Sequence, residues 1–178
     1  VTNLIEEEVT FADRTYTLTR KIVGTKESGR SLGANVTHSI DGLINRELIA
    51  RCQYDASQLY TLATLIQDGG FSDRGLPPSD NTGMVVTLWN HYCRTGFLSA
   101  RILSYLDASN LHMVDGKIIL DLLDSLPQKA FQVLSVHDCF RCLPNYANDL
   151  RQQYRGLLAQ LAKSNLLNDL LRQLAGSE

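Results

Sequence analysis

Two ionisable residues, His137 and Asp138, stand side by side in the largely apolar segment that runs from Phe131 to Leu143. Side chains alternate faces along a β-strand, and both faces of the segment before His137 are largely apolar. The pattern therefore predicts a strand buried on both faces, a tip at His137-Asp138 and a returning strand. A carboxylate at such a tip is able to hold a metal ion. The alternative is that Asp138 only closes the turn through hydrogen bonds to its own backbone.

Residues 136–140, Val-His-Asp-Cys-Phe, resemble the third catalytic motif, H-D-S-F, of the single-subunit DNA-dependent RNA polymerases of phages and mitochondria. In that family the Asp lies on a β-turn-β hairpin of the palm and binds the catalytic magnesium ions. The resemblance implies that Asp138 is a Mg²⁺ ligand and that His137 shares its catalytic motif. The related DNA polymerases have His-Asp-Glu there, so Phe140 after a small residue favours the RNA branch. Cys139 departs from the usual Ser, and a thiol is the weaker hydrogen-bond donor.

A second stretch, far upstream, also resembles this family. Residues 27–29 (Glu-Ser-Gly) and 34–42 (Ala-Asn-Val-Thr-His-Ser-Ile-Asp-Gly) are similar to its E-S-G and P-N-F-V-H-S-x-D-G blocks, in the same order and at nearly the same spacing. In the family, the His of this block lies near the growing RNA–template pair. The resemblance implies that role for His38, with Ser39 beside it, although Ala34 replaces the usual Pro. The alternative for His38 is a helix cap or a packed surface group.

The segment 24–33 is polar and contains glycine, which predicts a loop. Lys26 and Arg30 lie in it, close in sequence to the block that contains His38. Cations beside a catalytic centre can contact nucleic-acid phosphates, so both are candidate nucleic-acid ligands. A solvated loop is the commoner meaning of such charges.

The chain has 178 residues, a net charge of −2 and 44% hydrophobic residues, which suits one domain or a large module. A slightly acidic balance neither supports nor excludes a nucleic-acid partner, because only a cleft must attract phosphates. There is no long apolar run and no signal region, which predicts no membrane partner and a cytoplasmic location, the host cytoplasm if phage-encoded. Four scattered cysteines fit reduced thiols, and Cys139-x-x-Cys142 lacks a second Cys or His pair for zinc.

The rest of the pattern predicts an α+β fold that is mostly helical, with a small antiparallel hairpin and a helical insertion; the resemblance implies that this hairpin is a palm element. Val9–Val23 alternates polar and apolar residues and predicts another β-hairpin, with a turn at Asp13-Arg14. Asp41 is placed to cap a helix that begins at Gly42 or Leu43. We expect a break in this helical stretch near Asp55.

Three regions follow from these elements. We expect residues 1–52 to form the N-terminal hairpin, loop and first palm helix. Residues 53–129 extend that helix and add a helical insertion, with helices over Met84–Tyr92, Phe97–Leu106 and Ile118–Leu126 and with Trp89 as a core anchor.

The third region, residues 130–178, contains the catalytic-motif hairpin and the C-terminal helices. Pro144 stops the second strand of the hairpin, and Asn145 is placed to cap the helix that follows. The apolar face of this helix includes Leu158. A last helix begins after Ser164 or Asn165 and ends at Gly176.

Two-metal nucleotidyl transfer needs at least two carboxylates, and Asp138 supplies one. Nothing in the chain resembles the family's first palm motif or its fingers helix. The resemblance therefore implies the C-terminal palm part of such a polymerase, a subunit or fragment that is inert alone. It implies Mg²⁺, nucleoside triphosphates, a DNA template, an RNA product and a partner chain with the missing motifs. The alternatives are a non-catalytic helical interaction module with a degenerate hairpin and part of a related DNA polymerase, which Cys139 disfavours.

Overall fold

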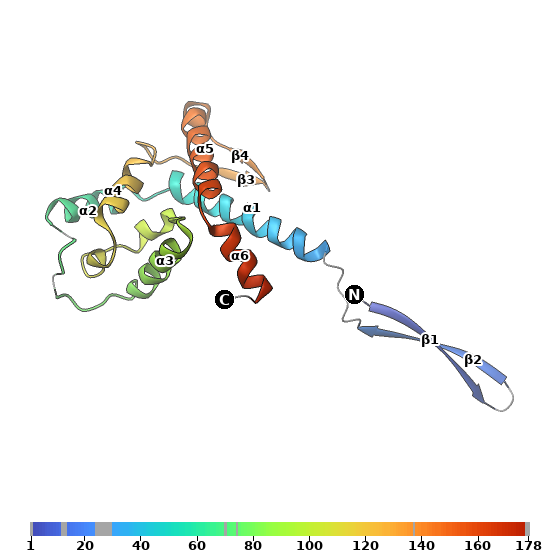
Figure 1. Cartoon of the computed structure of the whole chain (residues 1–178). Helices are drawn as coiled ribbons and strands as arrows, with labels where there is room; N and C mark the ends of the chain where they lie inside the picture. Colours follow the sequence, from blue (N-terminus) through green and yellow to red (C-terminus); the bar gives the residue numbers. More distant parts are fainter. Residues whose placement is uncertain are drawn as a thin grey trace. The chain divides into compact units, whose positions relative to one another are not determined.

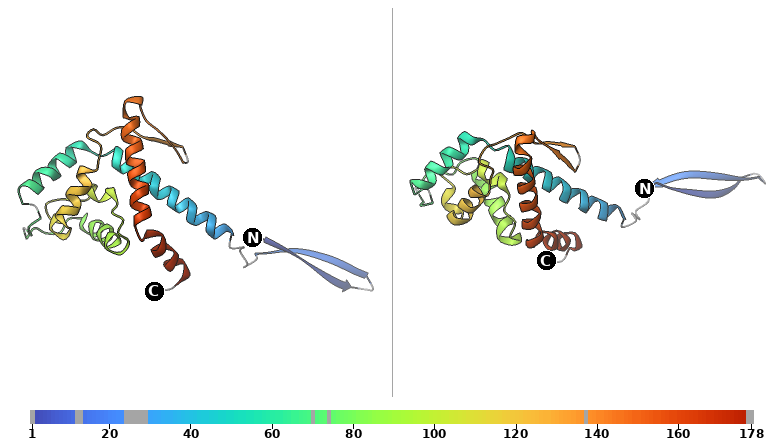
Figure 2. Two further views of the ribbon diagram at one scale, coloured as in Figure 1. Left: turned by 45° about the horizontal axis from the view of Figure 1, so that its top comes forward. Right: turned by 90° about the horizontal axis from the view of Figure 1, so that it is seen from above.

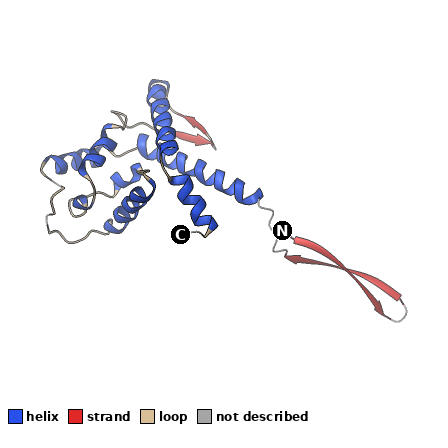
Figure 3. Ribbon diagram, viewed as in Figure 1, coloured by secondary structure: helices blue, strands red, loops and turns tan. Residues whose placement is uncertain are grey.

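The fold is α+β and mostly helical, with two separate antiparallel sheets of two strands each (Figure 1, Figure 3). This confirms the predicted fold class. The computed structural model divides into two compact units, residues 1–41 and 42–178. No helix among the described residues is long and apolar enough to cross a bilayer. The structure describes residues 2–11, 14–23, 30–69, 71–73, 75–136 and 138–176.

The first unit contains a long two-stranded ribbon. Strand β1 (Thr2–Phe11) pairs antiparallel with β2 (Arg14–Val23), in a register that sets Thr2 opposite Val23 and Phe11 opposite Arg14. The predicted hairpin is therefore present and longer than expected, because the first residues also form a strand. The predicted turn at Asp13-Arg14 is wrong for Arg14, which is the first residue of β2 and pairs with Phe11, whereas Asp13 lies outside the described residues. Every strand side chain whose exposure is described is exposed, and an ion pair of 2.7 Å joins Glu7 to Arg20.

Helix α1 (Arg30–Cys52) begins earlier than the sequence pattern predicts. The prediction of a loop through residue 33 and of a helix starting after Asp41 is wrong. Gly33 and Gly42 lie inside the helix, and neither has a positive φ. Glycine lowers helix stability without breaking the hydrogen-bond ladder, so a helix with a buried second half can run through it. Asp41 is consequently a mid-helix residue and caps nothing.

Three α-helices form most of the predicted insertion: α2 (Ala56–Gln67), α3 (Thr82–Thr95) and α4 (Gly116–Asp124). The predicted break is confirmed at Asp55, whose carboxylate accepts hydrogen bonds from the first backbone N–H groups of α2. Helix α3 ends at Gly96, which adopts a left-handed φ of 72°. Glycine enters that region without a steric penalty, which explains the stop.

The α-helix predicted over Phe97–Leu106 is wrong. The segment forms only a 3₁₀ turn at Ala100–Ser104, and a second 3₁₀ turn follows at Leu111–Met113. The first turn starts at Ser99, whose hydroxyl oxygen accepts a hydrogen bond from the Arg101 N–H. The polar contacts of this turn with α1, described below, fix it in place of a longer helix.

Two apolar clusters hold the second unit together. The first lies within α2, α3, α4 and the 3₁₀ turns, which Figures 1 and 2 show gathered as one group. Trp89 is half-buried against this cluster with its ring 5.2 Å from that of Tyr92, which confirms it as a core residue. The second cluster joins the end of α1 to the C-terminal region. Its buried members are Leu48, Cys52, Phe97, Phe131, Val133, Leu150 and Leu157.

Two helices complete the chain, α5 (Ala147–Lys163) and α6 (Leu166–Ala175). The predicted cap at Asn145 is wrong, because a 3₁₀ turn at Pro144–Tyr146 precedes α5 and no side chain caps it. The face of α5 is also narrower than predicted, since Leu158 is exposed. The end of α6 at Gly176, with φ of 64°, is as predicted.

Candidate functional site

The candidate site is the tip of a short hairpin in the second unit. Strand β3 (Leu134–Val136) pairs antiparallel with β4 (Cys139–Arg141), and Val136 lies opposite Cys139. Only two residues therefore connect the strands, as in the tightest β-hairpins. Asp138 occupies the turn and is exposed, as the sequence pattern predicts. His137, the other predicted tip residue, lies outside the described residues.

The base of this hairpin is fixed to α1. The Phe131 N–H donates to the carbonyl of Cys52, the last residue of α1, at 2.8 Å. The side-chain amide of Gln53 donates to the Val133 carbonyl at 3.2 Å. Phe131 is buried and stacks on Tyr146 with ring centroids 4.7 Å apart. These contacts hold the chain just before β3, so Asp138 projects from an anchored base.

The prediction that the strand before His137 is buried on both faces is wrong. Leu134 and Val136 are each 60% exposed, whereas Ser135 and Phe140, which pair with one another, are half-buried. The reason is the layer arrangement, because α5 covers one side of the hairpin and no described element covers the other. An apolar pattern shows that a face can be buried, and the covering element decides whether it is.

The upstream candidates lie on α1. His38 and Ser39 are exposed, and the Ser39 hydroxyl donates to the Asn35 carbonyl at 2.8 Å within the helix. Since α1 begins at Arg30, His38 does not cap its start. Of the two predicted phosphate ligands, Arg30 opens α1, but its side chain and all of Lys26 lie outside what the structure describes.

His38 belongs to the first compact unit and Asp138 to the second. His38 and Ser39 lie exposed on α1, and Asp138 lies exposed on the β3–β4 hairpin. Among the residues that the structure describes, no group of three or more His, Cys, Asp and Glu side chains gathers to hold a metal. An exposed single carboxylate nevertheless fits Mg²⁺, which keeps several waters and takes one or two protein carboxylates together with substrate phosphates.

The sequence pattern missed a buried pair of charges near the base of the hairpin. Glu47 and Arg51 are 1% and 2% exposed, one turn apart on α1. The Glu47 carboxylate accepts hydrogen bonds from the Ser99 hydroxyl and, at 2.8 Å, from the Ala100 N–H. A helical wheel gives no signal for this burial, because Glu and Arg in such positions usually face solvent.

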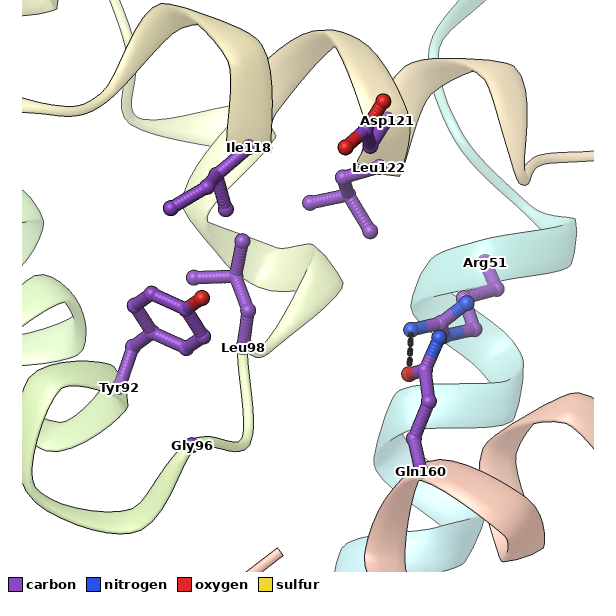
Figure 4. A pocket seen from close by; sticks show the side chains of 8 residues that line it. All are labelled: Arg51, Tyr92, Gly96, Leu98, Ile118, Asp121, Leu122 and Gln160. Atoms are coloured by element: carbon purple, nitrogen blue, oxygen red, sulfur yellow. Dashed lines mark hydrogen bonds between the residues drawn. The ribbon is translucent and has the colours of Figure 1, made fainter. Parts of the chain in front are cut away.

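Arg51 connects α1 to α5. Its Nη2 donates to Oε1 of Gln160 at 2.6 Å (Figure 4), and its Nη1 approaches the Ser125 hydroxyl at 3.5 Å. Burial lowers the pKa of Arg51, and the negative charge of Glu47 opposes that shift. The group remains a cation because its ordinary pKa is far above neutral.

Comparisons with known proteins add no family to this description. No family model matches the chain, and no curated protein matches it significantly.

Proposed function

We propose that this chain is the C-terminal palm portion, as a subunit or a fragment, of a single-subunit-type DNA-dependent RNA polymerase. It contributes Asp138 as a Mg²⁺ ligand for two-metal nucleotidyl transfer. A partner chain supplies the other palm carboxylate and the fingers motifs, and the two chains act on a DNA template, nucleoside triphosphates and a growing RNA. The cytoplasm, or the host cytoplasm for a phage protein, is the proposed location.

One observation carries the proposal: the Asp138 carboxylate is exposed at the tip of a two-residue β-hairpin with an anchored base. The H-D-S-F-like motif predicts this arrangement, although Asp is also a common turn residue in unrelated hairpins. A rigid support is also what the chemistry requires, because a ligand that positions a reacting group must be held closely.

Bound Mg²⁺ ions would activate the 3′-hydroxyl and hold the triphosphate. The contribution of this chain is positional. Asp138 offers carboxylate oxygens to the ions, and the contacts of Phe131 and Phe140 with the α5 region keep the hairpin in place. His38 and Ser39 are exposed, so they are accessible to the RNA–template pair. The proposed role of His137 is to stand beside Asp138 in the motif.

Exposed apolar residues support a partner chain. Leu134, Val136 and Leu143 are all at least 60% exposed, and they belong to the hairpin or follow it directly. Large exposed apolar patches on a soluble chain mark interaction surfaces. A partner that supplied the second carboxylate beside Asp138 would lie next to these residues.

A second candidate function is a helical interaction module without catalysis. Helix α6 favours it, because Leu167, Leu171 and Leu174 lie about one turn apart and are each nearly half exposed. Such a face binds an apolar groove whether or not Asp138 binds metal. The two functions differ in one respect, since only the polymerase function requires nucleotide incorporation.

Reconstitution separates these functions. The partner should be encoded in a neighbouring reading frame with an Asp-containing palm motif and an Arg/Lys/Tyr fingers helix. The two chains should co-sediment, and Mg²⁺-dependent RNA synthesis on a DNA template should require both. Co-sedimentation without RNA synthesis on any template would favour the interaction module. A chain that sediments as a monomer in the presence of the neighbouring gene product would contradict the proposed pairing of the two chains.

A further inference from the structure

A cavity of about 270 Å³ lies in the second unit, where side chains of α1, α3, α4 and α5 face one another (Figure 4). Arg51 and Gln160 form one end of it. Leu98, Ile118 and the ring of Tyr92 form the other end, as Figure 4 shows. The cavity thus has a cationic, hydrogen-bonding end and an apolar end. Nothing in the proposed polymerase function uses it.

Arg51 has fewer hydrogen bonds than its burial demands. A guanidinium carries five N–H donors. Only the bond from Nη2 to Gln160 is short, while the contact from Nη1 to Ser125 is 3.5 Å and the buried Nε has no partner. Glu47 supplies a compensating charge, but its hydrogen bonds go to Ser99 and Ala100. The Nε atom is closed off from solvent, so an oxyanion would bind at the two Nη groups, whose remaining N–H donors have no partner among the described residues.

The second partner at this end is adaptable. Gln160 is exposed, and in the described residues its side-chain nitrogen has no hydrogen-bond acceptor. A rotation of Gln160 would free Nη2 of Arg51 for an incoming oxygen. The amide nitrogen of Gln160 could then donate to the second oxygen of the same group. This pairing of a guanidinium with an amide suits a planar carboxylate.

We infer that this cavity binds a small monocarboxylate with an apolar body, its carboxylate against Arg51 and Gln160 and its tail among Leu98, Ile118 and Tyr92. Inorganic phosphate has no apolar group to fill the apolar end. The Asp121 carboxylate also lines the cavity and repels a dianion more strongly than a monoanion. The volume is slightly below the roughly 300 Å³ at which ordinary ligand pockets begin, so the ligand must be small.

Hexanoate is a suitable probe, with hexanamide as its neutral isostere and inorganic phosphate as an anion without a tail. Thermal unfolding and calorimetric titration of the full chain should show saturable binding of hexanoate. Hexanamide and phosphate should bind at least tenfold more weakly, because a hydrogen bond to a charged group is worth about one such factor or more. Hexanoate that binds only the folded state should also raise the melting temperature of the chain.

Variants locate the binding. Gln160→Leu should weaken hexanoate about tenfold, and Ile118→Trp should abolish binding by filling the apolar end. Gln152→Leu is the matched control, because Gln152 lines only a neighbouring cavity that shares Arg51 and Gln160. These variants avoid Arg51 itself, whose loss could unfold the chain.

Three results would overturn the inference. Equal binding of hexanamide would show that the tail alone binds, and equal binding of phosphate would show a nonspecific cation. No saturable binding of hexanoate would mean that Arg51 is satisfied by water and serves only to join α1 to α5. None of these measurements depends on RNA synthesis, so the outcome is independent of the polymerase proposal.

Discussion

The ring of Phe140 lies 5.6 Å from the ring of Tyr154, centroid to centroid, and joins β4 to helix α5. Phe140 follows Asp138 by two residues, so this contact lies directly behind the hairpin tip. The hairpin has only three paired positions. A two-stranded hairpin of this length is not stable alone, and its order depends on packing against α5.

Replacing Phe140 with Ala should therefore loosen the hairpin before it affects the rest of the fold. We expect the free energy of unfolding to fall by about 1–3 kcal/mol, less than for a fully buried Phe. Amide hydrogen exchange should accelerate in residues 134–141 and stay slow in α5. RNA synthesis by the reconstituted chains should fall at least tenfold.

Phe71→Ala is the control for this variant, because Phe71 is also half-buried but packs on the first apolar cluster. It should lower overall stability and leave exchange in the hairpin unchanged. Unchanged hairpin exchange in the Phe140 variant would show that Tyr154 does not hold the tip.

The burial of Glu47 and Arg51 predicts that removing one of the two charges destabilises the chain more than removing both. Glu47→Ala removes the acceptor for Ser99 and Ala100 and leaves the Arg51 charge uncompensated, so we expect a loss of about 3–5 kcal/mol. Chemical denaturation measures it. The double variant Glu47→Met with Arg51→Met should lose less than Glu47→Ala alone, because no buried charge remains. A loss for the double variant as large as that of Glu47→Ala, or larger, would contradict coupling between the two residues.

Alkaline pH should destabilise the second unit through Cys52. Burial, and secondarily the nearby Cys142, raise the pKa of the Cys52 thiol from 9.0 to about 12. The folded pKa exceeds the unfolded one, so the contribution of this group is fully present below pH 9.0 and is lost as pH rises toward 12. Within that window the loss is up to about 1.4 kcal/mol per pH unit.

The measurement is the free energy of unfolding against pH for the wild type and for Cys52→Ala. At neutral pH the free energy of unfolding should be lower for the variant than for the wild type, because the substitution leaves a small cavity. Above pH 9.0 it should fall less steeply for the variant. The exposed Cys93 and Cys139 should react with an alkylating agent at neutral pH while Cys52 does not. Parallel pH curves would contradict the shifted pKa.

Acidic pH should destabilise the insertion through Asp107. Burial alone would raise the pKa of this carboxyl, but hydrogen bonds from Ser109 and Ser79 outweigh it and lower the pKa below 3.8. The stabilising contribution is therefore present above pH 3.8 and is lost as pH falls through the lowered folded value.

Asp107→Asn should lose about 1–2 kcal/mol at neutral pH, and its deficit relative to the wild type should shrink below pH 3.8. Ser79→Ala, which removes one of the hydrogen bonds, should show a smaller deficit with the same pH trend. A deficit that does not change with pH would show that Asp107 acts without its charge.

Local signals predicted the fold where one residue decides the structure. The break at Asp55, the end of the last helix at Gly176 and Asp138 at a hairpin tip follow from short-range chemistry. The two-residue hairpin tip also required no knowledge of distant contacts.

Local sequence signals failed where the burial of a residue depends on an element that is distant in the sequence. The burial of Arg51 depends on Gln160 and Ser125, more than seventy residues away in sequence. The exposure of Leu134 and Val136 depends on the lack of a described layer over one face of the hairpin. Composition and periodicity cannot predict whether these side chains are buried, because the local sequence is the same whether or not a distant element covers them.

The Asp138→Asn substitution tests the central proposal most directly. Asn keeps the size and most turn hydrogen bonds of Asp but removes the charge that Mg²⁺ needs. The measurement is nucleotide incorporation by the reconstituted chains, with thermal unfolding alongside and the exposed Asp80→Asn as the matched control. We predict a loss of several orders of magnitude for Asp138→Asn at an unchanged melting temperature and wild-type synthesis for Asp80→Asn. Undiminished incorporation by the Asp138 variant would contradict a role for this hairpin in metal binding.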